Sequence, residues 1–461
     1  MMIVMKFGGT SVGSADAIRR VCSIIKSRMS QQPVVVTSAV GGVTNKLVRL
    51  AKLAGAGDLQ AQPLLEEIVA QHRHIAEALG IAGDPIFAKT FDEGEAMLRQ
   101  AAARIRENGA LSDELYDGVI SMGEFFTANI LPAVLRAAGI TGVMTDARQM
   151  LVTDDHFSSA RPLFAESKPR AQKILVPLVK NGQIPVTQGF VGATRDGRTT
   201  TLGRGGSDYS ATLFGAMMEA SVVEIWSDVD GVLTADPSLV PEAHRIRYMS
   251  FQEAAELAYF GAKVLHPATL APAVEHDMTV KVLNSMNPDF DGTAISKHAP
   301  VDAAHQGRVK SIAYKEGLTV ITVSSDRMLM AFGFMAKVFS IFEKYETPVD
   351  LVSTSEVTVS MTIDQLKNLE KIIAELEAFG SVRVERAKAI VCLVGEGLKR
   401  TKGVPGQIFG LLQDTHIHLI SQGASEINLS FVIDEADLPR VITRLHGYFF
   451  NGDLDPRVFV E

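Results

Sequence analysis

Short apolar runs rich in β-branched residues alternate with stretches of helical period over the first part of the chain. Apolar runs lie at 3–5 and 34–36, and between them Ile18, Val21, Ile25 and Met29 fall near one face of a predicted helix. Further strands are predicted at 140–146, 184–193, 221–228 and 279–283. Near-continuous apolar strands between helices are typical of a parallel sheet that helices cover on both faces. The pattern therefore predicts one large α/β domain.

The pattern changes after this domain. Residues 284–307 carry prolines, aspartates and glycines with little periodicity, so we interpret the later part of this stretch as a linker. The predicted boundaries are 1–290 for the first domain, 291–307 for the linker and 308–461 for a C-terminal region.

The C-terminal region contains an internal repeat. The stretch that begins at Gly333 recurs at Gly403, 70 residues later, and 349–353 recurs as 417–421. Each copy predicts the order strand, helix, strand, strand, helix, strand, which is an α+β module of ferredoxin-like type. The two modules are predicted at about 316–390 and 391–461. Two copies favour paired sheets that form a binding or dimerisation platform, and a purely architectural duplication is the alternative.

Composition narrows the class of protein. The 461-residue chain is 46% hydrophobic and 21% charged, as in ordinary globular proteins, and its net charge of −8 argues against nucleic-acid or anionic-membrane partners. Its two cysteines, Cys22 and Cys392, lie far apart, which excludes a disulfide framework and is typical of a reducing cytosol. The N-terminus lacks the features of a signal peptide, and no apolar stretch is predicted to span a membrane. We therefore expect a cytoplasmic protein.

The run from Lys6 to Ser11 follows the first predicted strand directly. Glycines at the carboxyl end of a strand let the backbone come close to a ligand, and Gly8 and Gly9 would leave free N–H groups that face it. Lys6 adds a mobile positive charge. The arrangement suits a phosphate, although it is not a Walker A loop and a plain strand-to-helix turn is the alternative.

The stretch 198–210 is dense in groups that bind anions. It holds three adjacent threonines, two arginines and three glycines, and it leads into an apolar helix. Ser207 or Asp208 is the predicted N-cap of that helix, which would place orphan N–H groups and the positive dipole end at the loop. Arg204 can hold a carboxylate with two parallel hydrogen bonds. Such a loop is seldom structural filler, so we predict a binding site here.

Three further motifs are ambiguous by themselves. The carboxylates of 226–237 follow a predicted strand and could hold a metal or a ribose, but Asp-Gly and Asp-Pro also mark ordinary turns. Lys263, near a predicted helix N-terminus, could reach nucleotide phosphates, whereas His266 is interpreted as a packed or capping side chain. Glu124 heads an apolar helix, where a solvated helix-start glutamate is the alternative to a functional one.

Taken in order, these segments resemble the aspartate kinases of the amino-acid kinase superfamily over nearly the whole chain. The matching segments are 6–11, 38–39 with 44–45, 199–208 and 260–267. The repeat resembles the tandem ACT modules of this family. The resemblance implies an α/β amino-acid kinase fold, with a largely parallel sheet between helices, and a C-terminal α+β ferredoxin-like tandem ACT region.

The resemblance also implies an activity. ATP, with Mg²⁺, would phosphorylate the β-carboxylate of L-aspartate, giving 4-phospho-L-aspartate and ADP in the first step towards lysine, threonine and methionine. Lysine would be the feedback effector, and the ACT modules would assemble a homodimer or homotetramer. The alternatives are a related acyl-phosphate-forming kinase that acts on glutamate or N-acetylglutamate, and a non-catalytic amino-acid sensor. Glu124, Arg204 and the paired modules favour aspartate, and the retention of Lys6, Asp208 and Lys263 argues against the sensor.

Single residues receive roles from the same resemblance, and no side chain is assigned to a metal. Lys6 and Asp208 would be catalytic, with Asp208 orienting Lys6. Arg204 would bind the α-carboxylate of aspartate and Glu124 its α-ammonium. The residues implied at ATP are Lys6, Gly8, Gly9, Ser227, Asp228, Leu233, Lys263 and Val264. Those implied at aspartate are Ser38, Thr44, Glu124, Arg204, Gly205, Gly206 and Ser207. Those implied at the lysine effector are Met328, Phe334, Met335, Val349, Asp350, Thr354, Ser355 and Glu356.

Overall fold

The computed structural model describes residues 2–261, 265, 267–297, 307–326, 332–423, 425–452 and 454–460. These residues form two compact units. The first takes in 1–232, 247–251 and 264–299, and the second takes in 233–246, 252–263 and 300–461. The segments 233–246 and 252–263, which precede the predicted domain boundary at 290, therefore pack with the second unit. The predicted boundaries themselves stay a prediction.

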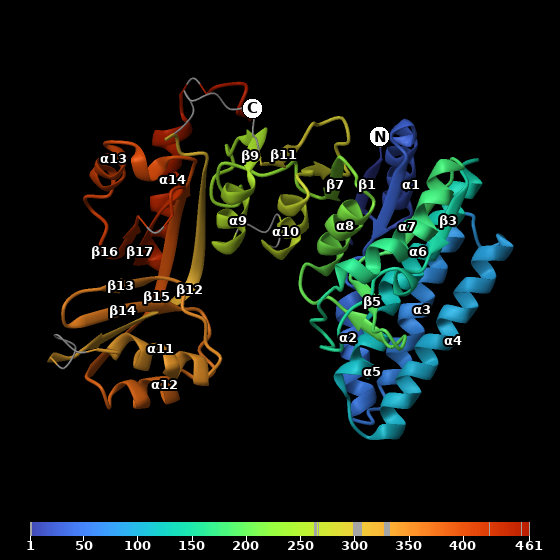
Figure 1. The fold of residues 1–461 in the computed structure, drawn as a ribbon, viewed down its shortest axis with the longest axis horizontal. Coiled ribbons are helices and arrows are strands. Elements are labelled where there is room, and N and C mark those ends of the chain that lie inside the picture. The colour runs from blue at the N-terminus through green and yellow to red at the C-terminus, as the bar shows by residue number, and fades with distance from the viewer. Residues whose placement is uncertain are drawn as a thin grey trace. The chain divides into compact units, whose positions relative to one another are not determined.

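A mostly parallel sheet forms the centre of the first unit (Figure 1). Its strand order is β3-β4-β2-β1-β7-β10-β11-β9. The central strand β1 pairs in parallel with both β2 and β7, whereas β11 runs antiparallel to β10. The strands are β1 Ile3–Phe7, β2 Pro33–Thr37, β3 Gly142–Thr145, β4 Ile184–Gln188, β7 Val222–Ser227, β9 Tyr248–Ser250, β10 Thr279–Asn284 and β11 Thr293–Ser296, and a separate pair is β5 Val191–Ala193 with β6 Thr199–Thr201. The predicted parallel sheet is confirmed.

Helices cover both faces of this sheet. Alternate residues of β1, namely Ile3, Met5 and Phe7, pack into one core with α1 and α6, and α2 to α5 add an outer helical layer. The other face packs on α8, where a side chain on Gly215 would meet Val223 of β7. The helices are α1 Ala15–Ser27, α2 Val43–Gly55, α3 Ala61–Ala78, α4 Pro85–Asn108, α5 Asp113–Ile120, α6 Met122–Ala137, α7 Phe164–Lys180, α8 Gly206–Met217 and α10 Pro267–Glu275. Lys6 lies on the α8 side, because it alternates with Met5 and Phe7.

Three predicted elements differ in detail. Helix α1 ends at Ser27, so Met29 falls outside the buried stripe, lies in a short 3-10 helix and is 38% exposed. The predicted strand 184–193 is two strands, because Phe190 between them has a φ of 67°, outside the strand region. The predicted linker is not irregular throughout, since β11 lies inside it and pairs with β10.

One sheet also forms the centre of the second unit. Within the described residues its order is β13-β14-β12-β15-β17-β16. The predicted paired sheets are therefore wrong: β12 and β15, each 14 residues long, run through both modules, so the two halves share one sheet. The predicted module boundary between 390 and 391 falls inside β15. The strands are β8 Arg245–Ile246, β12 Ser311–Ser324, β13 Val352–Thr354, β14 Thr358–Ile363, β15 Ser381–Val394, β16 Ile417–Gln422, β17 Asn428–Asp434 and β18 Phe459–Val460.

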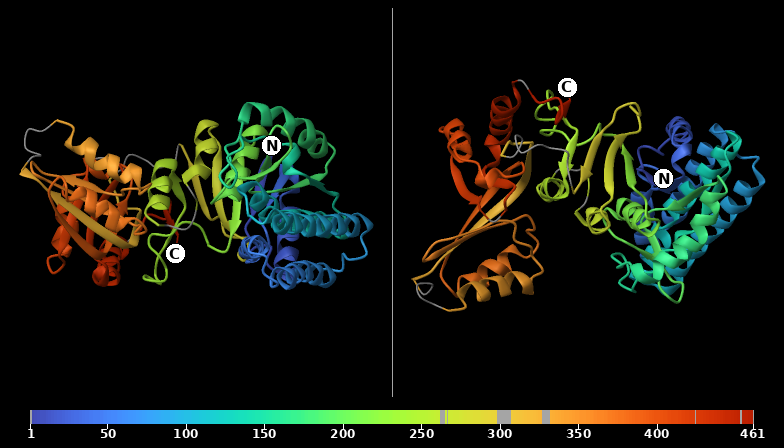
Figure 2. Two further views of the ribbon diagram at one scale, coloured as in Figure 1. Left: turned by 90° about the horizontal axis from the view of Figure 1, so that it is seen from below. Right: turned by 45° about the horizontal axis from the view of Figure 1, so that its top comes forward.

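The internal repeat is visible in this unit. Helices α11 and α13 start at matching positions, each after a glycine in the left-handed region, Gly333 with φ 76° and Gly403 with φ 87°. Figure 2 shows the orange helices of the first module and the red helices of the second module packed on their own strands. The last strand, β18, pairs with β8 and does not join the six-strand order. The helices are α9 Phe251–Tyr259, α11 Phe334–Lys344, α12 Leu369–Leu376, α13 Val404–Leu411 and α14 Leu438–Phe450.

One stretch of the described chain is long and apolar enough to cross a membrane. It is Asp113–Ala137, which contains α5 and α6, and 94% of its most apolar window is buried inside the protein. The core of the first unit therefore accounts for this stretch.

Candidate active site

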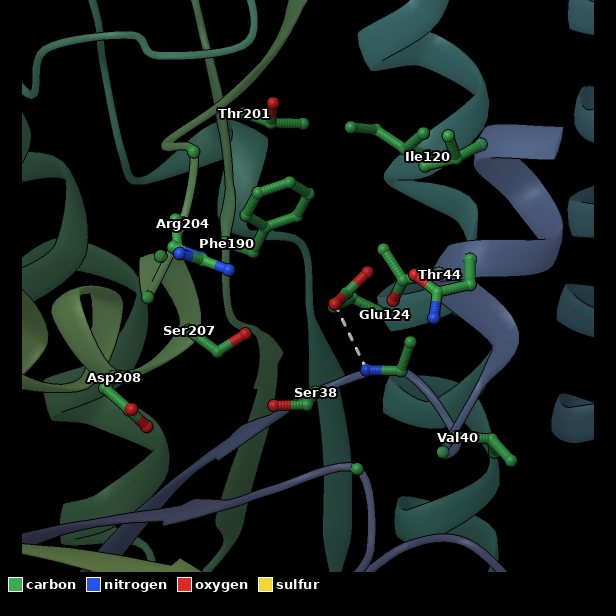
Figure 3. Close-up of a pocket in the computed structure, with 18 of the residues that line it drawn as sticks. Ser38, Val40, Thr44, Ile120, Glu124, Phe190, Thr201, Arg204, Ser207 and Asp208 are labelled. Carbon is green, nitrogen blue, oxygen red and sulfur yellow. Dashed lines mark hydrogen bonds between the residues drawn. The ribbon is translucent and has the colours of Figure 1, made fainter. Parts of the chain in front are cut away.

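A cavity of about 690 Å³ opens in the first unit beside the carboxyl ends of β1 and β2. Its walls come from the loop after β2, from α2, from α5 and α6, and from the connection between β6 and α8 (Figure 3). Ten predicted site residues line it: Lys6, Gly9, Ser38, Thr44, Glu124, Arg204, Gly205, Gly206, Ser207 and Asp208. Segments that are far apart in the sequence thus meet at one place, as the motifs predict.

Lys6, which is buried, and Asp208, which is partly buried, form an ion pair at one side of this cavity. Lys6 faces α8 because it alternates with Met5 and Phe7 along β1, and Asp208 lies in the first turn of α8. The predicted N-cap is wrong, since α8 begins at Gly206 and its N-cap is Gly205, whose φ of 72° favours glycine. Ser207 and Asp208 are therefore inside the first turn, where the positive end of the helix dipole stabilises the Asp208 carboxylate.

The glycines of the first motif allow two loops to pack closely. A side chain on Gly9 would lie 3.0 Å from the carbonyl oxygen of Ala39, and Gly41 donates its N–H to the carbonyl oxygen of Gly9 at 3.0 Å. The N–H of Gly8 is not free as predicted, because it donates to the carbonyl oxygen of Trp226 at 3.0 Å. Gly8 thus holds the β1 loop against β7, and Gly9 borders the cavity.

Glu124 is buried at the head of α6, with 3% of its surface exposed. Its Oε1 atom accepts the backbone N–H of Ala39 at 3.2 Å, and its Oε2 atom has no hydrogen-bond partner among the described residues. Burial raises the pKa of this carboxyl to about 8, and the N–H of Ala39 and the charge of Lys6 oppose the rise. The alternative of a solvated helix-start glutamate is therefore wrong.

Polar side chains stand on facing walls of the cavity. Figure 3 shows Arg204, Ser207 and Asp208 on one side, with Glu124 and Thr44 on the other and Ser38 between them. No carboxylate pairs with Arg204 within the described residues, so its guanidinium can take a ligand. A cation site at Glu124 that faces an anion site at Arg204 is suited to the ammonium and carboxylate of an amino acid.

Most of the residues predicted at ATP either do not line the cavity or lie outside the described residues. Ser227 ends β7 and Asp228 follows it on the exposed surface, and neither lines the cavity. Leu233 belongs to the second unit, where its carbonyl oxygen accepts the hydroxyl of Ser311 at 2.8 Å. Lys263 and Val264 lie outside the described residues.

Sequence reasoning missed the polar contacts that hold the β7 loop. The Ser285 hydroxyl, after β10, lies 2.8 Å from the Ser11 hydroxyl and donates to the carbonyl oxygen of Ser227 at 3.0 Å. The Asn284 amide donates to the Asp230 carboxylate at 2.8 Å. These contacts tie the loops that follow β1, β7 and β10. The sequence could have indicated these contacts, because the polar residues follow predicted parallel strands, and the carboxyl ends of neighbouring parallel strands share one edge of a sheet.

The cavity also has walls that no motif indicated. Tyr116 and Ile120 on α5, Ser158, and Phe190 between β4 and β5 all line it. No cluster of three His, Cys, Asp or Glu side chains with metal-binding geometry occurs in the described part of the chain.

The predicted effector residue Asp350 lies in a network of charges in the second unit. Its Oδ1 atom accepts the ammonium of Lys315 at 2.8 Å and the hydroxyl of Tyr259 at 3.1 Å, and Lys315 also contacts Asp364 at 2.9 Å. The Oδ2 atom of Asp350 is buried and lacks a hydrogen-bond partner among the described residues.

The other predicted effector residues differ in their exposure. Phe334, Met335 and Val349 belong to the core of the first module or pack against it. Thr354, Ser355 and Glu356 are exposed at the turn between β13 and β14. Met328 lies outside the described residues.

Two family models match the chain. The amino acid kinase family matches residues 1–284, and an ACT domain matches residues 391–449. Among curated proteins, aspartokinase 1, chloroplastic, of Arabidopsis thaliana is 36% identical over 98% of this chain and 81% of its own length. Lysine-sensitive aspartokinase 3 of Escherichia coli (strain K12) is 36% identical over 97% of this chain and 99% of its own length.

Solved structures match over the same range. Aspartokinase III of E. coli in complex with aspartate and ADP, in the R-state, has a TM-score of 0.83 at 36% identity and covers 98% of this chain and 100% of that one. The same enzyme with lysine and aspartate, in the T-state, has a TM-score of 0.82 at 36% identity and covers 97% and 99%. Sequence, fold and cavity therefore agree that the chain belongs to the aspartokinases of the amino acid kinase family.

Proposed function

We propose that this enzyme transfers the γ-phosphoryl group of ATP to the β-carboxylate of L-aspartate, giving 4-phospho-L-aspartate and ADP. The observation that carries the proposal is one cavity in which the Lys6–Asp208 pair lies beside Glu124 and Arg204. The relative of known structure that binds aspartate and ADP supports the same reaction. The product leads towards lysine, threonine and methionine.

The cavity residues divide into two roles. Arg204 holds the α-carboxylate of aspartate and Glu124 its α-ammonium, while Ser38, Thr44, Gly205, Gly206 and Ser207 complete the lining. This orientation leaves the β-carboxylate directed at Lys6. Lys6 and Gly9 then face the transferring phosphoryl group, Gly8 holds the loop after β1 against β7, and Asp208 holds the Lys6 ammonium in place.

The chemistry is one of positioning and charge. The β-carboxylate has a pKa near ~4 and is ionised at pH 7, so no general base is needed. The obstacle is repulsion between this anion and the phosphate, since two unit charges ~4 Å apart interact by roughly 4 kcal/mol at an effective dielectric constant of 20. Lys6 and the N–H groups of α8 offset that repulsion and stabilise the charge that is spread over the equatorial oxygens during in-line transfer.

The nucleotide is proposed to lie at the loops after β1 and β7, near Ser227 and Asp228, which both belong to the first unit. When bound with ATP, Mg²⁺ would neutralise part of the charge of the phosphates, and no side chain of this chain is assigned to it.

An assay of three acids tests the function. ADP release with L-aspartate, L-glutamate and N-acetyl-L-glutamate should be fast with aspartate alone, and hydroxylamine should trap the acyl phosphate. N-acetylglutamate lacks the ammonium that Glu124 is proposed to bind. Preference for either glutamate compound would favour a related kinase, and no ADP release with any of the acids would favour a sensor.

Lysine is the proposed effector, and Asp350 is proposed to bind its ammonium. The partnerless Oδ2 atom of Asp350 supports this role, because a buried acceptor of this kind gains a partner when a cation arrives. The hydroxyl of Tyr259 contacts the same carboxylate, and Tyr259 ends α9 just before the 260–267 motif.

Replacing Asp350 with alanine should relieve inhibition. The half-inhibitory lysine concentration is expected to rise by about tenfold or more, because a charge-assisted contact to the effector is lost, while kcat without lysine changes little. Steady-state assays across a lysine series measure both values. Asp364→Asn is the matched control, since it also removes a partner of Lys315 but no proposed effector contact. Unchanged lysine sensitivity in Asp350→Ala would contradict the assignment.

We further propose a homodimer or homotetramer that is assembled through the ACT modules in the cytoplasm. The edge strands β13 and β16 support this assembly, because they expose the apolar side chains of Val352 and Ile420, which are 39% and 48% exposed.

A further inference from the structure

Asp117, on α5, is a fully buried carboxylate that the proposed reaction does not use. Its Oδ2 atom accepts the backbone N–H groups of Ser158 and Thr201, each at 2.8 Å. Its Oδ1 atom accepts the hydroxyl of Thr201 at 2.7 Å and that of Ser158 at 3.3 Å. Burial raises the pKa of this carboxyl, and the four donors oppose the rise. One side chain on a helix therefore anchors two separate segments of chain.

Both anchored residues border the active-site cavity. Ser158 and Thr201 line it, and so do Tyr116 and Ile120, the neighbours of Asp117 on α5. Figure 3 shows Thr201 and Ile120 on opposite sides of the cavity. Asp117 does not line the cavity, so any effect on the substrate passes through the residues that it holds.

The segment at Ser158 has an unfavourable backbone conformation. Ser158 has a φ of 66°, in the left-handed region that L-residues other than glycine rarely adopt. Asp117 bonds both the N–H and the hydroxyl of this residue, which supplies a reason for the conformation to persist. The carbonyl of Ser158 then lies against Gly203, where a Cβ would approach it to 3.1 Å. Gly203 directly precedes Arg204.

We propose that Asp117 is a positioning residue for the acceptor substrate: by holding Ser158 and Thr201 it fixes the loop 202–204 that presents Arg204 to the α-carboxylate of aspartate. The loop is fixed from both sides, by Thr201 at its start and by Ser158 packed on Gly203. The inference rests on the proposed function, because it assumes that Arg204 binds the amino acid.

The arrangement of the four bonds indicates which variant should rescue the site. The two N–H donors meet one carboxylate oxygen, and the two hydroxyls meet the other. In Asp117→Asn the amide oxygen can accept both N–H groups, and the amide NH₂ can donate to both hydroxyl oxygens, which accept as well as donate. Asp117→Ala loses all four bonds. Asparagine should therefore preserve the loop and alanine should not.

Kinetics of the two variants test the inference. In Asp117→Ala the KM for aspartate should rise by roughly 10-fold to 100-fold, because small displacements of a binding group have effects of this size. The KM for ATP should stay within about twofold, and Asp117→Asn should stay within about threefold of the wild type for aspartate. If the alanine variant does not fold, Asp117→Ser gives the same comparison, since its hydroxyl replaces at most part of the four bonds. Calorimetric titration of aspartate should show the same loss of affinity.

Three results would overturn the inference. They are an unchanged KM for aspartate in the alanine or serine variant, an asparagine variant as impaired as alanine, and an equal rise in the KM values for ATP and aspartate. Glu114→Gln is the matched control, because Glu114 lies on the same helix and pairs with Arg198 next to β6 at 3.4 Å without lining the cavity. It should behave as the wild type. A wild-type enzyme that does not phosphorylate aspartate would refute the proposed function itself, whereas these variants test only Asp117.

Discussion

Replacing Lys6 with methionine is expected to lower kcat by roughly 100-fold to 1000-fold. In other enzymes, kcat falls by a factor of this size when one preorganised group that stabilises a developing negative charge is removed. Lys6 is 8% exposed and is paired with Asp208 at the end of β1, so its ammonium is fixed before substrate arrives. Methionine keeps the volume of the side chain and removes its charge. Steady-state turnover at saturating ATP and aspartate measures the loss.

The variant should still fold. The apolar stem of the side chain at position 6 is retained, and Asp208 keeps the favourable dipole at the start of α8. Thermal unfolding should therefore move by no more than a few degrees. Lys168→Met is the matched control, because Lys168 pairs with Glu219 on the surface at 2.8 Å and should not affect turnover. Near-normal turnover in Lys6→Met would remove the proposed role of Lys6.

The sequence predicted the centre of the fold because that part depends on strong local patterns. Every residue of β1 and β2 is buried, so neither strand has a solvent-exposed face, and such strands occur between helical layers. The split of 184–193 at Phe190 was not predictable in this way, because an apolar residue with a positive φ looks like any strand residue in the sequence. The shared sheet of the second unit was missed for a similar reason: a repeat shows that two modules exist, and it does not show that β12 and β15 run through both.

The motifs predicted which residues belong to the site, and they did not predict how far its charged groups are buried. Chain order and resemblance indicated that Lys6, Glu124, Arg204 and Asp208 belong to one site, and the cavity brings them together. Whether Glu124 is solvated or buried depends on what packs around α6, and in the structure nearly every residue of that helix is buried. Asp117 could have been found, because it precedes Glu124 by seven residues, about two helical turns.

Glu124 should make aspartate binding depend on pH between about 6 and 8. Burial raises the pKa of this carboxyl to about 8 in the free enzyme, so at pH 7 it is mostly protonated and neutral. The α-ammonium of aspartate binds the ionised form, so binding must release a proton. The KM for aspartate should therefore fall as pH rises, by up to about tenfold per pH unit, and should level off above pH 8. Steady-state assays from pH 6 to 9 measure this profile.

Glu124→Gln should remove the pH dependence and weaken binding. The amide cannot supply a negative charge to the ammonium, so the KM for aspartate at pH 8 should rise by roughly 100-fold, the effect of losing a buried charged partner. Arg204→Ala is the comparison, because it should also raise this KM while the pH profile remains. A glutamine variant that keeps the wild-type profile would show that a different group titrates.

The same substitution should stabilise the free enzyme at alkaline pH. The folded pKa of about 8 exceeds the ordinary value of 4.5, so the unfolded chain loses a proton that the folded protein keeps as pH rises. The free energy of unfolding of the wild type should therefore fall between about pH 4.5 and 8, by a few kcal/mol in total, and Glu124→Gln should lack this decline. Urea unfolding at pH 5 and pH 8.5 measures the difference. The ionisable carboxyl of Glu124 would then lower the free energy of unfolding, although the enzyme needs that carboxyl to bind an ammonium. An equal change of the unfolding free energy with pH in the two proteins would contradict that account.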